Sequence, residues 1–452
     1  MSLYLCAIAA ALCFSIGQRS LVKGLIVLLG IGYVYGITRA NFPDSYSHFL
    51  FDAAVLGFYA ALLLRRMSLA EEHRVASIKP WVELLIAWPI LVFIIPNQDF
   101  SVRLLGLRAN ILLLPFIIVG ARLDDTEKYD AAILLAILNL AAFVVGLAEF
   151  STGVESFFPH NQVSELVYSS KDVAGYSAYR IPSTFIGSHA YAGTMVMSLP
   201  LLIGALHQTN RRVLHKSLLI SALIASLLGV LLAASRSHFI GAAAVVVVAI
   251  FSTRTKGSHL VGWILVLATI GWLVSGEQRL QRFTELRDTE MVTQRIAGSV
   301  NMGFFELAAT FPFGNGLGSG THIPYFLSAS VRNPVGIENE FGRIVLELGL
   351  VGLGLWVAFI VWLLMQPGPL PSDPWSIGRR LAWVVSLIYL GLSFAGTGLL
   401  TSIPQTCLLL LNVGWVAARR SAQRSESVLS EKNNVMAQGA RLRSSAVQVG
   451  RI

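Results

Sequence analysis

The chain has 452 residues, of which 55% are hydrophobic and only 13% are charged. A typical soluble protein carries about 25% charged residues, and a soluble fold of this size could not hide so much apolar surface from water. The composition therefore excludes a soluble globular protein and indicates a polytopic membrane protein. The net charge of +9 does not indicate nucleic-acid binding, because Lys and Arg of membrane proteins collect in cytoplasmic loops and tails.

Runs of about 20 mostly apolar residues mark the helices that could cross a bilayer. Thirteen spans are favoured, and twelve remain possible because the first and ninth runs are short. The first run lacks the basic start and cleavage site of a secretory signal, so we expect it to be retained. The expected spans are 2–17, 21–38, 48–64, 81–96, 104–120, 131–150, 185–206, 217–234, 238–252, 259–275, 341–365, 381–398 and 400–418.

Two long polar connections and a basic tail interrupt this pattern. Together with the spans they predict an all-α chain with N-terminal transmembrane helices in 1–150, a first loop in 151–184 and central helices in 185–275. A large loop in 276–340, C-terminal helices in 341–418 and a disordered tail in 419–452 complete the organisation. The tail is rich in Ser, Arg and Gln and almost free of aromatic residues, which is typical of disorder.

The distribution of Lys and Arg predicts the orientation. One set of connections, together with the tail, carries 22 of the 34 basic residues, and the other set, with both long loops, carries 12. The first set is expected to be cytoplasmic and both long loops extracytoplasmic. Thirteen spans would place the N-terminus outside, and twelve would place it inside.

Several arginines nevertheless fall on the expected outer side. A guanidinium forms planar, bidentate contacts with phosphate oxygens, so converging arginines could hold a diphosphate whose lipid tail lies in the bilayer. The alternative is that they bind lipid headgroups or pair with Glu285, Asp288 and Glu290, especially Arg279, Arg282 and Arg287. The outer arginines are Arg180, Arg236, Arg279, Arg282, Arg287, Arg295, Arg332 and Arg343.

Three short segments contain the most informative of these arginines. The first runs from Arg180 (RIPSTFIGSHAYAG) to Gly193, and the second is ASRSHFIG in 234–241. The third extends from Arg295 through PFGNGLG in 312–318 to ENEFGRIVLELGLVG in 338–352. Together, in this order around the spans, they resemble the O-antigen polymerase and O-antigen ligase superfamily over about residues 150–365.

The resemblance implies a helical membrane glycosyltransferase of the GT-C type in the bacterial inner membrane. Such enzymes transfer a glycan from an undecaprenyl-diphosphate carrier to a glycan or lipid acceptor at the outer face. It implies that Arg180 and Arg295 bind the lipid diphosphate, with Arg236 in a second substrate-binding segment. Membrane lipids and other polysaccharide-assembly proteins are the further partners expected, and nucleic acid is not.

The catalytic base is less well matched to that family. Its members often place a His-Asn pair before the last motif helix, and this pair aligns with Glu338 and Asn339. A carboxylate can deprotonate a sugar hydroxyl if it lies within hydrogen-bond reach, so Glu338 is preferred over His322 as the base, and Asn339 is expected at the substrate. Undecaprenyl diphosphate is already a good leaving group, and no DxD pair lies in an outer loop. No metal or cofactor is therefore expected.

Four other features have structural interpretations. The glycine-rich stretch 314–320 is expected to be a flexible outer turn, and 292–309 an amphipathic interfacial helix. His189 is expected to hydrogen-bond between helices rather than to catalyse. Arg108, inside an apolar run, should face the bundle interior or a carboxylate such as Glu83 or Glu149.

Two functional questions remain open at the level of the sequence. A polymerase and a ligase use the same donor and differ in the acceptor, which no motif identifies. A multi-span transporter or flippase for an anionic or lipid-linked glycan is the alternative from another class, although no inverted repeat is visible.

Overall fold

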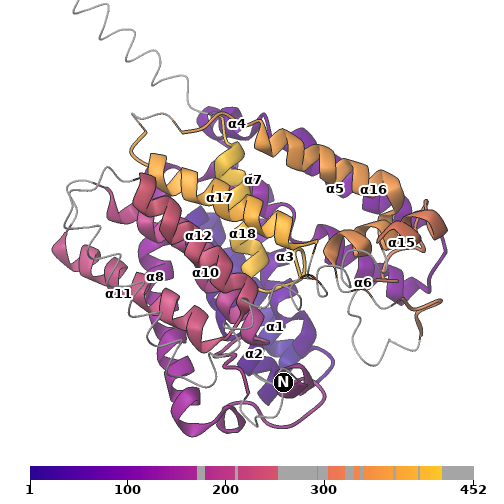
Figure 1. The fold of residues 1–452 in the computed structure, drawn as a ribbon, viewed down its shortest axis with the longest axis horizontal. Coiled ribbons are helices and arrows are strands. Elements are labelled where there is room, and N and C mark those ends of the chain that lie inside the picture. The colour runs from indigo at the N-terminus through magenta and orange to yellow at the C-terminus, as the bar shows by residue number, and fades with distance from the viewer. Residues whose placement is uncertain are drawn as a thin grey trace, which may run out of the picture.

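The computed structural model describes residues 1–169, 179–208, 212–252, 293, 304–320, 330–335, 337, 339–369, 373–394, 396 and 398–419. In this part of the chain the regular elements are all helices (Figure 1). The first half contains α1 (Ser2–Arg19), α2 (Leu21–Asn41), η1 (Ser47–Phe49), α3 (Leu50–Leu64), α4 (Leu69–Val75), α5 (Lys79–Ile94), α6 (Phe100–Ile111), α7 (Phe116–Arg122), α8 (Asp125–Thr152), η2 (Val154–Ser156) and α9 (Glu165–Ser169). The second half contains α10 (Ser188–Leu206), α11 (Val213–Leu232), α12 (Arg236–Ser252), α15 (Phe304–Thr310), α16 (Glu340–Leu364), α17 (Ser376–Leu392) and α18 (Gln405–Ala417).

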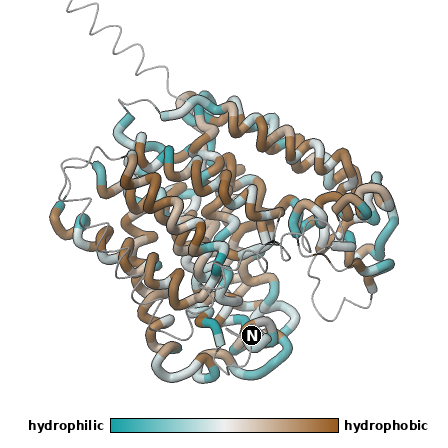
Figure 2. Tube along the Cα trace, in the orientation of Figure 1, coloured by the Kyte–Doolittle hydropathy of each residue, from teal (hydrophilic) through white to brown (hydrophobic). Residues whose placement is uncertain are grey.

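Eight helical segments within the described residues are long and apolar enough to cross a membrane. A ninth would be the pair α4 and α5, which is bent by 63°, while α12 and α18 are apolar but shorter. Hydrophobic residues dominate these helices in Figure 2. The expectation of an all-α chain with many apolar helices is confirmed in this form. The count is smaller than the twelve or thirteen spans predicted, and the predicted span 259–275 lies outside the described residues.

The predicted span 381–398 is wrong at its C-terminal end, because α17 ends at Leu392. Tertiary contacts take the backbone groups that would continue the helix. The carbonyl oxygen of Ser393 accepts a hydrogen bond from the Glu340 amide (2.9 Å), and the Gly398 amide donates to the Glu340 carboxylate (3.0 Å). The last helix then begins at Gln405, directly after Pro404.

Of the predicted interfacial helix 292–309, the structure describes Thr293 and the residues from Phe304 on, which belong to α15. Leu307 is buried against Val345 and Leu346 of α16, while Phe305 is 71% exposed. Helix α15 is therefore amphipathic and packs on α16. Arg295 and most of the remaining residues of the predicted helix lie outside the described ranges.

The connections gather at two ends of the helix bundle. At the first, which we call the first-loop end, Asn41 donates to the Phe157 carbonyl (3.0 Å) and Cys6 to the Tyr46 carbonyl (3.4 Å). Figure 1 shows the N-terminus here, at the lower end of the view, and α4 at the upper end. The N-terminus thus shares an end with the first loop, as the thirteen-span topology predicts.

The opposite end, which we call the tail end, holds the beginning of the C-terminal tail. The Arg419 amide donates to the Arg74 carbonyl (3.0 Å), and the Arg74 guanidinium donates to the Arg122 carbonyl (2.5 Å). Arg122 in turn pairs with Glu71 at 3.2 Å. All three arginines come from the group of connections predicted to be cytoplasmic. Their meeting at one end is the arrangement that the charge distribution requires.

A buried asparagine joins four helices in the interior. Asn139 of α8 accepts from the Tyr33 hydroxyl of α2 (2.5 Å) and donates to Ser198 of α10 (2.7 Å) and Ser226 of α11 (2.8 Å). Such interhelical hydrogen bonds hold apolar helices together where lipid removes the hydrophobic driving force. This network fixes α10, which carries the end of the first motif segment, and α11, which leads into the second, against the N-terminal helices.

The partner predicted for Arg108 is wrong. Arg108 forms a bidentate pair with Asp52 of α3, with Nε–Oδ2 at 2.5 Å and Nη2–Oδ1 at 2.7 Å. Glu83 lies instead 3.7 Å from Lys79, and Glu149 accepts the Ser183 amide. The prediction did identify that the cation needs a carboxylate, but the helix that supplies it depends on the packing.

Candidate functional site

The first motif segment enters α10 through a fixed backbone path. The Ser183 amide donates to Glu149 of α8 (2.8 Å), and the Ser183 hydroxyl donates to the Ala142 carbonyl (2.7 Å). Ser183 itself has a φ of 52°, a conformation that is uncommon outside glycine. The Ile37 amide of α2 donates to the Thr184 carbonyl (3.0 Å). The residues after Arg180 are therefore held between α8 and α2.

Arg180 is buried at the start of this segment. Its side chain is only 7% exposed, and Nη1 lies 3.2 Å from Nε2 of His189. Within the described residues, Arg180 Nε, Thr184 Oγ1 and Ser188 Oγ are buried without a hydrogen-bond partner. Buried polar groups without partners carry a free-energy cost. This segment therefore contains several buried hydrogen-bonding groups that have no partner among the described residues.

The second motif segment meets the first through a serine. Ser235, in the turn between α11 and α12, lies 3.2 Å from His189 Nδ1 and 2.6 Å from His238 Nδ1, both measured to its Oγ. The turn has strained backbone at Ala234, with a φ of 47°. Arg180, His189, Ser235 and His238 form a continuous hydrogen-bonded chain, which we call the arginine–histidine cluster.

Gly193 lets a third element reach this cluster. A Cβ placed on Gly193 would lie 2.0 Å from Gln405 Oε1 of α18 and 2.7 Å from His238 Nε2 of α12. The aromatic ring of Tyr389, in α17, has its centroid 5.4 Å from that of His238. The glycine that ends the first motif thus leaves the space beside it to the side chains of Gln405 and His238, which would have to shift for a larger residue.

Arg236 is the first residue of α12 and is partly exposed beside Ser235. The second motif therefore brings both an arginine and a histidine to the first-loop end. Arg295, His322 and Glu338 lie outside the described residues, as do Arg279, Arg282 and Arg287. The predicted joint role of Arg180 and Arg295, and the choice between Glu338 and His322, stay predictions.

The third motif segment forms a separate buried ionic cluster. Arg343 of α16 donates through Nε (2.8 Å) and Nη2 to Glu340, and through Nη1 to Glu347 (2.8 Å). Asn110 of α6 accepts from Arg343 (3.2 Å) and donates to Glu347 (2.6 Å). The idea that Arg343 is a free outer cation for a diphosphate is therefore wrong, because two carboxylates occupy its guanidinium.

Glu340 and Glu347 were missed as structural residues by the sequence reasoning. Glu340 precedes Arg343 by three residues and Glu347 follows it by four, so all three lie on one helix face. This spacing could have indicated the ion pairs from the sequence. Asn339 accepts from the Gly342 amide and caps α16. Its predicted role at the substrate stays a prediction.

The glycine-rich segment is packed rather than flexible, contrary to the expectation. Leu317 is fully buried and Ser319 is 4% exposed. The Asn315 amide donates to the Leu346 carbonyl (2.6 Å), and the Gly320 amide donates to Glu347 (3.3 Å). The segment is fixed by carbonyl and carboxylate groups of α16 that its own sequence does not reveal.

The two clusters are linked through the end of α17. Ser393 donates from its amide to the Tyr389 carbonyl (3.0 Å), and its own carbonyl accepts the Glu340 amide. Tyr389 packs on His238, as described above. All three motif segments therefore connect at the ends of α16, α17 and α10. The contact between His238 and Tyr389 joins residues about 150 positions apart in the sequence.

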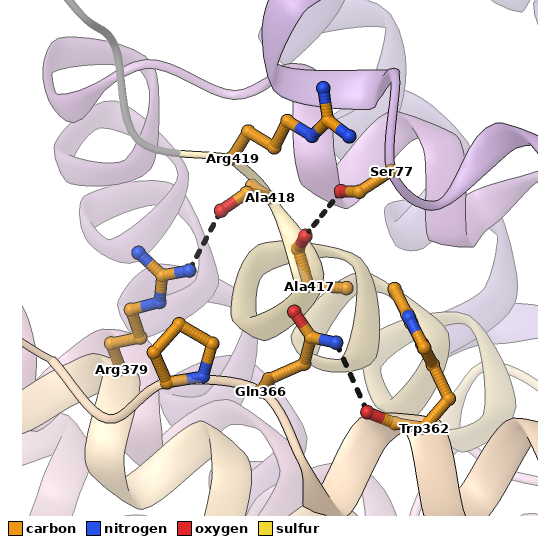
Figure 3. A pocket seen from close by; sticks show the side chains of 8 residues that line it. Ser77, Trp362, Gln366, Arg379, Ala417, Ala418 and Arg419 are labelled. Carbon is orange, nitrogen blue, oxygen red and sulfur yellow. Dashed lines mark hydrogen bonds between the residues drawn. The ribbon is translucent and has the colours of Figure 1, made fainter.

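A pocket of about 370 Å³ lies at the tail end (Figure 3). Arg379 donates from Nη2 to the carbonyls of Val416 (2.6 Å) and Ala418 (2.8 Å), and Ser77 donates to the Ala417 carbonyl (3.0 Å). These contacts satisfy the open C-terminus of α18. None of the predicted site residues lines this pocket. Its lining residues are Ser77, Trp362, Gln366, Pro367, Arg379, Ala417, Ala418 and Arg419.

Within the described ranges, no group of three or more His, Cys, Asp or Glu side chains could hold a metal ion. The arginine–histidine cluster is built from guanidinium, imidazole and hydroxyl groups, and the Glu149 carboxylate holds the Ser183 amide of the same segment. No protein-family model matches the sequence, and no curated protein matches it at a significant level.

Proposed function

We propose that this protein is a glycosyltransferase of the bacterial inner membrane. It transfers or polymerises an oligosaccharide carried on undecaprenyl diphosphate, at the outer face, as O-antigen or exopolysaccharide polymerases and ligases do. The proposal starts from the resemblance of the three motif segments. It is supported by the arginine–histidine cluster, in which two of those segments come together at the first-loop end.

The observation that carries the proposal is the surroundings of Arg180. Three arginines are buried in the described part of the chain, namely Arg122, Arg180 and Arg343. Arg122 and Arg343 each pair with carboxylates. Among the described residues, Arg180 contacts a histidine instead of a carboxylate, and its Nε has no hydrogen-bond partner. A buried cation without a counter-ion is costly, and an anionic ligand would remove that cost.

A polyprenyl diphosphate fits this position chemically. Its phosphates accept charge-assisted hydrogen bonds from a guanidinium, and its chain can stay in the bilayer. Holding donor and acceptor together can supply about 7–11 kcal/mol of the activation barrier. Arg180 would also stabilise the negative charge that develops on the departing diphosphate. Arg295 is proposed as the second diphosphate ligand, with Arg236 near the substrate.

The experiment is complementation of a strain in which the gene is deleted. Arg180→Ala and Arg295→Ala are expected to abolish surface polysaccharide while protein levels in the membrane stay unchanged. Arg332→Ala is the matched control, because Arg332 is 61% exposed and pairs with exposed Asp99 at 2.6 Å. It should complement like the wild type.

Full complementation by both Arg180→Ala and Arg295→Ala would show that the diphosphate assignment is wrong. A reconstituted assay that measures glycan extension separately from substrate flux identifies the reaction class. A flippase would move the lipid-linked glycan across the bilayer without lengthening it or joining it to an acceptor.

A further inference from the structure

A strained turn follows Arg180 in the first motif segment. It comprises residues 182–185, which we call the Ser183 turn, and the Phe185 amide closes it on the Pro182 carbonyl (3.1 Å). Ser183 has a φ of 52°. This left-handed conformation is uncommon outside glycine and persists only where the surroundings enforce it. The position of the turn therefore depends on its contacts with the neighbouring helices.

Glu149 of α8 is the side chain that holds this turn. Its Oε2 accepts the Ser183 amide at 2.8 Å. The hydrogen bonds to the Ala142 carbonyl and from the Ile37 amide use main-chain groups of α8 and α2, which any residue type supplies. Glu149 is thus the contact that a substitution can remove while the helix backbones stay in place.

The location of Glu149 is unfavourable for a carboxyl group. Glu149 is 1% exposed, and its Oε1 is buried without a hydrogen-bond partner among the described residues. It also lies in the last turn of α8, where the negative end of the helix dipole disfavours an acidic side chain. Buried ionisable groups in membrane helices usually serve a function. The contact with the Ser183 amide therefore points to a role beyond packing.

The segment around the turn is confined between α8 and α2. Ile181 is 1% exposed and lies beside α8, where a Cβ added to Gly146 would be 3.6 Å from Ile181 Cγ2. On the α2 side, a Cβ added to Gly36 would be 2.0 Å from the Phe185 carbonyl carbon. The chain therefore has little room to move directly after Arg180 as long as the turn stays on α8.

We propose that Glu149 is a positioning residue for Arg180: its carboxyl group fixes the Ser183 turn and so sets where the Arg180 guanidinium meets the donor diphosphate. This inference rests on the proposed function and deepens it, because it assigns a residue that touches neither donor nor acceptor. Without this hydrogen bond the turn relaxes to an unstrained conformation. The fraction of molecules with Arg180 in its binding position then falls, and the apparent dissociation constant rises in proportion.

The test measures donor affinity separately from folding. Binding of farnesyl diphosphate, a short polyprenyl diphosphate, is measured by calorimetry on the purified full chain in detergent. Glu149→Ala should raise the dissociation constant about ten-fold or more, and the KM for the lipid-linked donor in host membranes should rise in parallel. Calorimetry gives the affinity and the number of sites independently, so a loss of folded protein lowers the second and not the first.

Three further variants separate the hydrogen bond from the charge and from general stability. Glu149→Gln keeps an acceptor oxygen at the same side-chain length and should bind like the wild type. Glu149→Asp keeps the carboxylate but is shorter by a methylene group, so it should lose the contact with Ser183 and bind as weakly as Glu149→Ala. Tyr59→Phe is the matched control. It removes the hydrogen bond to the Leu112 carbonyl (2.8 Å), elsewhere in the bundle, and should leave the affinity unchanged.

The outcomes distinguish this inference from the proposed function. Wild-type affinity of Glu149→Ala would show that Glu149 does not position Arg180, although the donor assignment to Arg180 would stand. Weak binding by Glu149→Gln with wild-type binding by Glu149→Asp would show that the charge acts rather than the hydrogen bond, and would overturn the inference. If Glu149→Ala does not fold, these two variants decide in the same way. If the wild type does not bind farnesyl diphosphate, or if Arg180→Gln binds it equally well, the donor assignment fails and the inference falls with it.

Discussion

Arg180 and Arg343 are both buried arginines in motif segments, but their surroundings give them opposite roles. Arg343 has hydrogen bonds to Glu340, Glu347 and Asn110, so its charge is balanced inside the protein. Among the described residues, the side-chain contact of Arg180 is with His189 rather than with a carboxylate. The same residue type therefore serves as a structural ion partner in one segment and as a candidate anion ligand in the other.

This contrast predicts different consequences of substitution. Arg343→Ala would leave two buried carboxylates without their cation, and losing one side of a buried pair costs about 3–5 kcal/mol. We expect a marked loss of folded protein, measured by thermal unfolding in detergent. Arg332→Ala removes an exposed pair and should change the free energy of unfolding by no more than about 1 kcal/mol. A normally folded Arg343→Ala protein would contradict the structural role.

Among the elements, α16 is bent where the glycine-rich segment binds to it. Gly349 has a φ of 70° and a ψ of −174° inside the helix. The Leu350 amide, released from the helical pattern, donates to the Pro312 carbonyl (2.9 Å). At the bend, backbone groups of α16 therefore form hydrogen bonds with residues 312–315 instead of within the helix. The bend also places Glu340 and Arg343 against α6.

Gly349→Ala should disturb this bend. The combination of positive φ and extended ψ is essentially restricted to glycine and costs another residue about 1–3 kcal/mol, and the alanine Cβ would lie 2.8 Å from the Pro312 carbonyl oxygen. Gly354→Ala, on the same helix, meets nothing within 4 Å and should be neutral or stabilising by up to about 1 kcal/mol. Thermal unfolding of both variants decides the matter, and equal melting temperatures would show that the bend is not required.

A second glycine controls the junction of α10, α12 and α18. Gly193→Ala would force Gln405 and His238 apart, because its Cβ would approach them to 2.0 and 2.7 Å. We expect reduced polysaccharide in the complementation assay with protein still present. Gly391→Ala, which meets nothing within 4 Å, is the control. Wild-type activity of Gly193→Ala would mean that the His238 side of the cluster has no functional importance.

The whole molecule is organised by its two ends, which carry different chemistry. The first-loop end holds the arginine–histidine cluster and the N-terminus, and the tail end gathers Arg74, Arg122 and Arg419. From the positive-inside rule we expect the tail end to be cytoplasmic. The candidate site would then face the outside, which is the side that the proposed function requires.

Cysteine labelling tests this sidedness in intact cells. The native Cys6, Cys13 and Cys407 are buried and should give little background. Ser156→Cys, exposed at the first-loop end, should react with a membrane-impermeant maleimide added outside. Thr126→Cys, exposed at the tail end, should react only after the membrane is opened. Labelling of both positions from outside would contradict the two-ended topology.

Composition and the lengths of the apolar runs were sufficient to predict a membrane protein and the approximate positions of its helices. Apolar runs of bilayer length leave a chain few alternatives to helices, because only helices satisfy the backbone within a single segment in lipid. The need of Arg108 for a carboxylate followed in the same way from the cost of burying a charge. These conclusions depend on local composition, which is fully visible in a linear sequence.

The partners of the polar residues, in contrast, depend on how the helices pack in three dimensions. Asp52 rather than Glu83 or Glu149 pairs with Arg108, the end of α17 is set by Glu340, and His189 meets Ser235 from 46 positions away. The glycine-rich stretch 314–320 is fixed by carbonyl and carboxylate groups of α16. Such pairs depend on how helices cross and on which faces they share. Long-range packing settles that geometry, and the order of residues in one segment does not contain it.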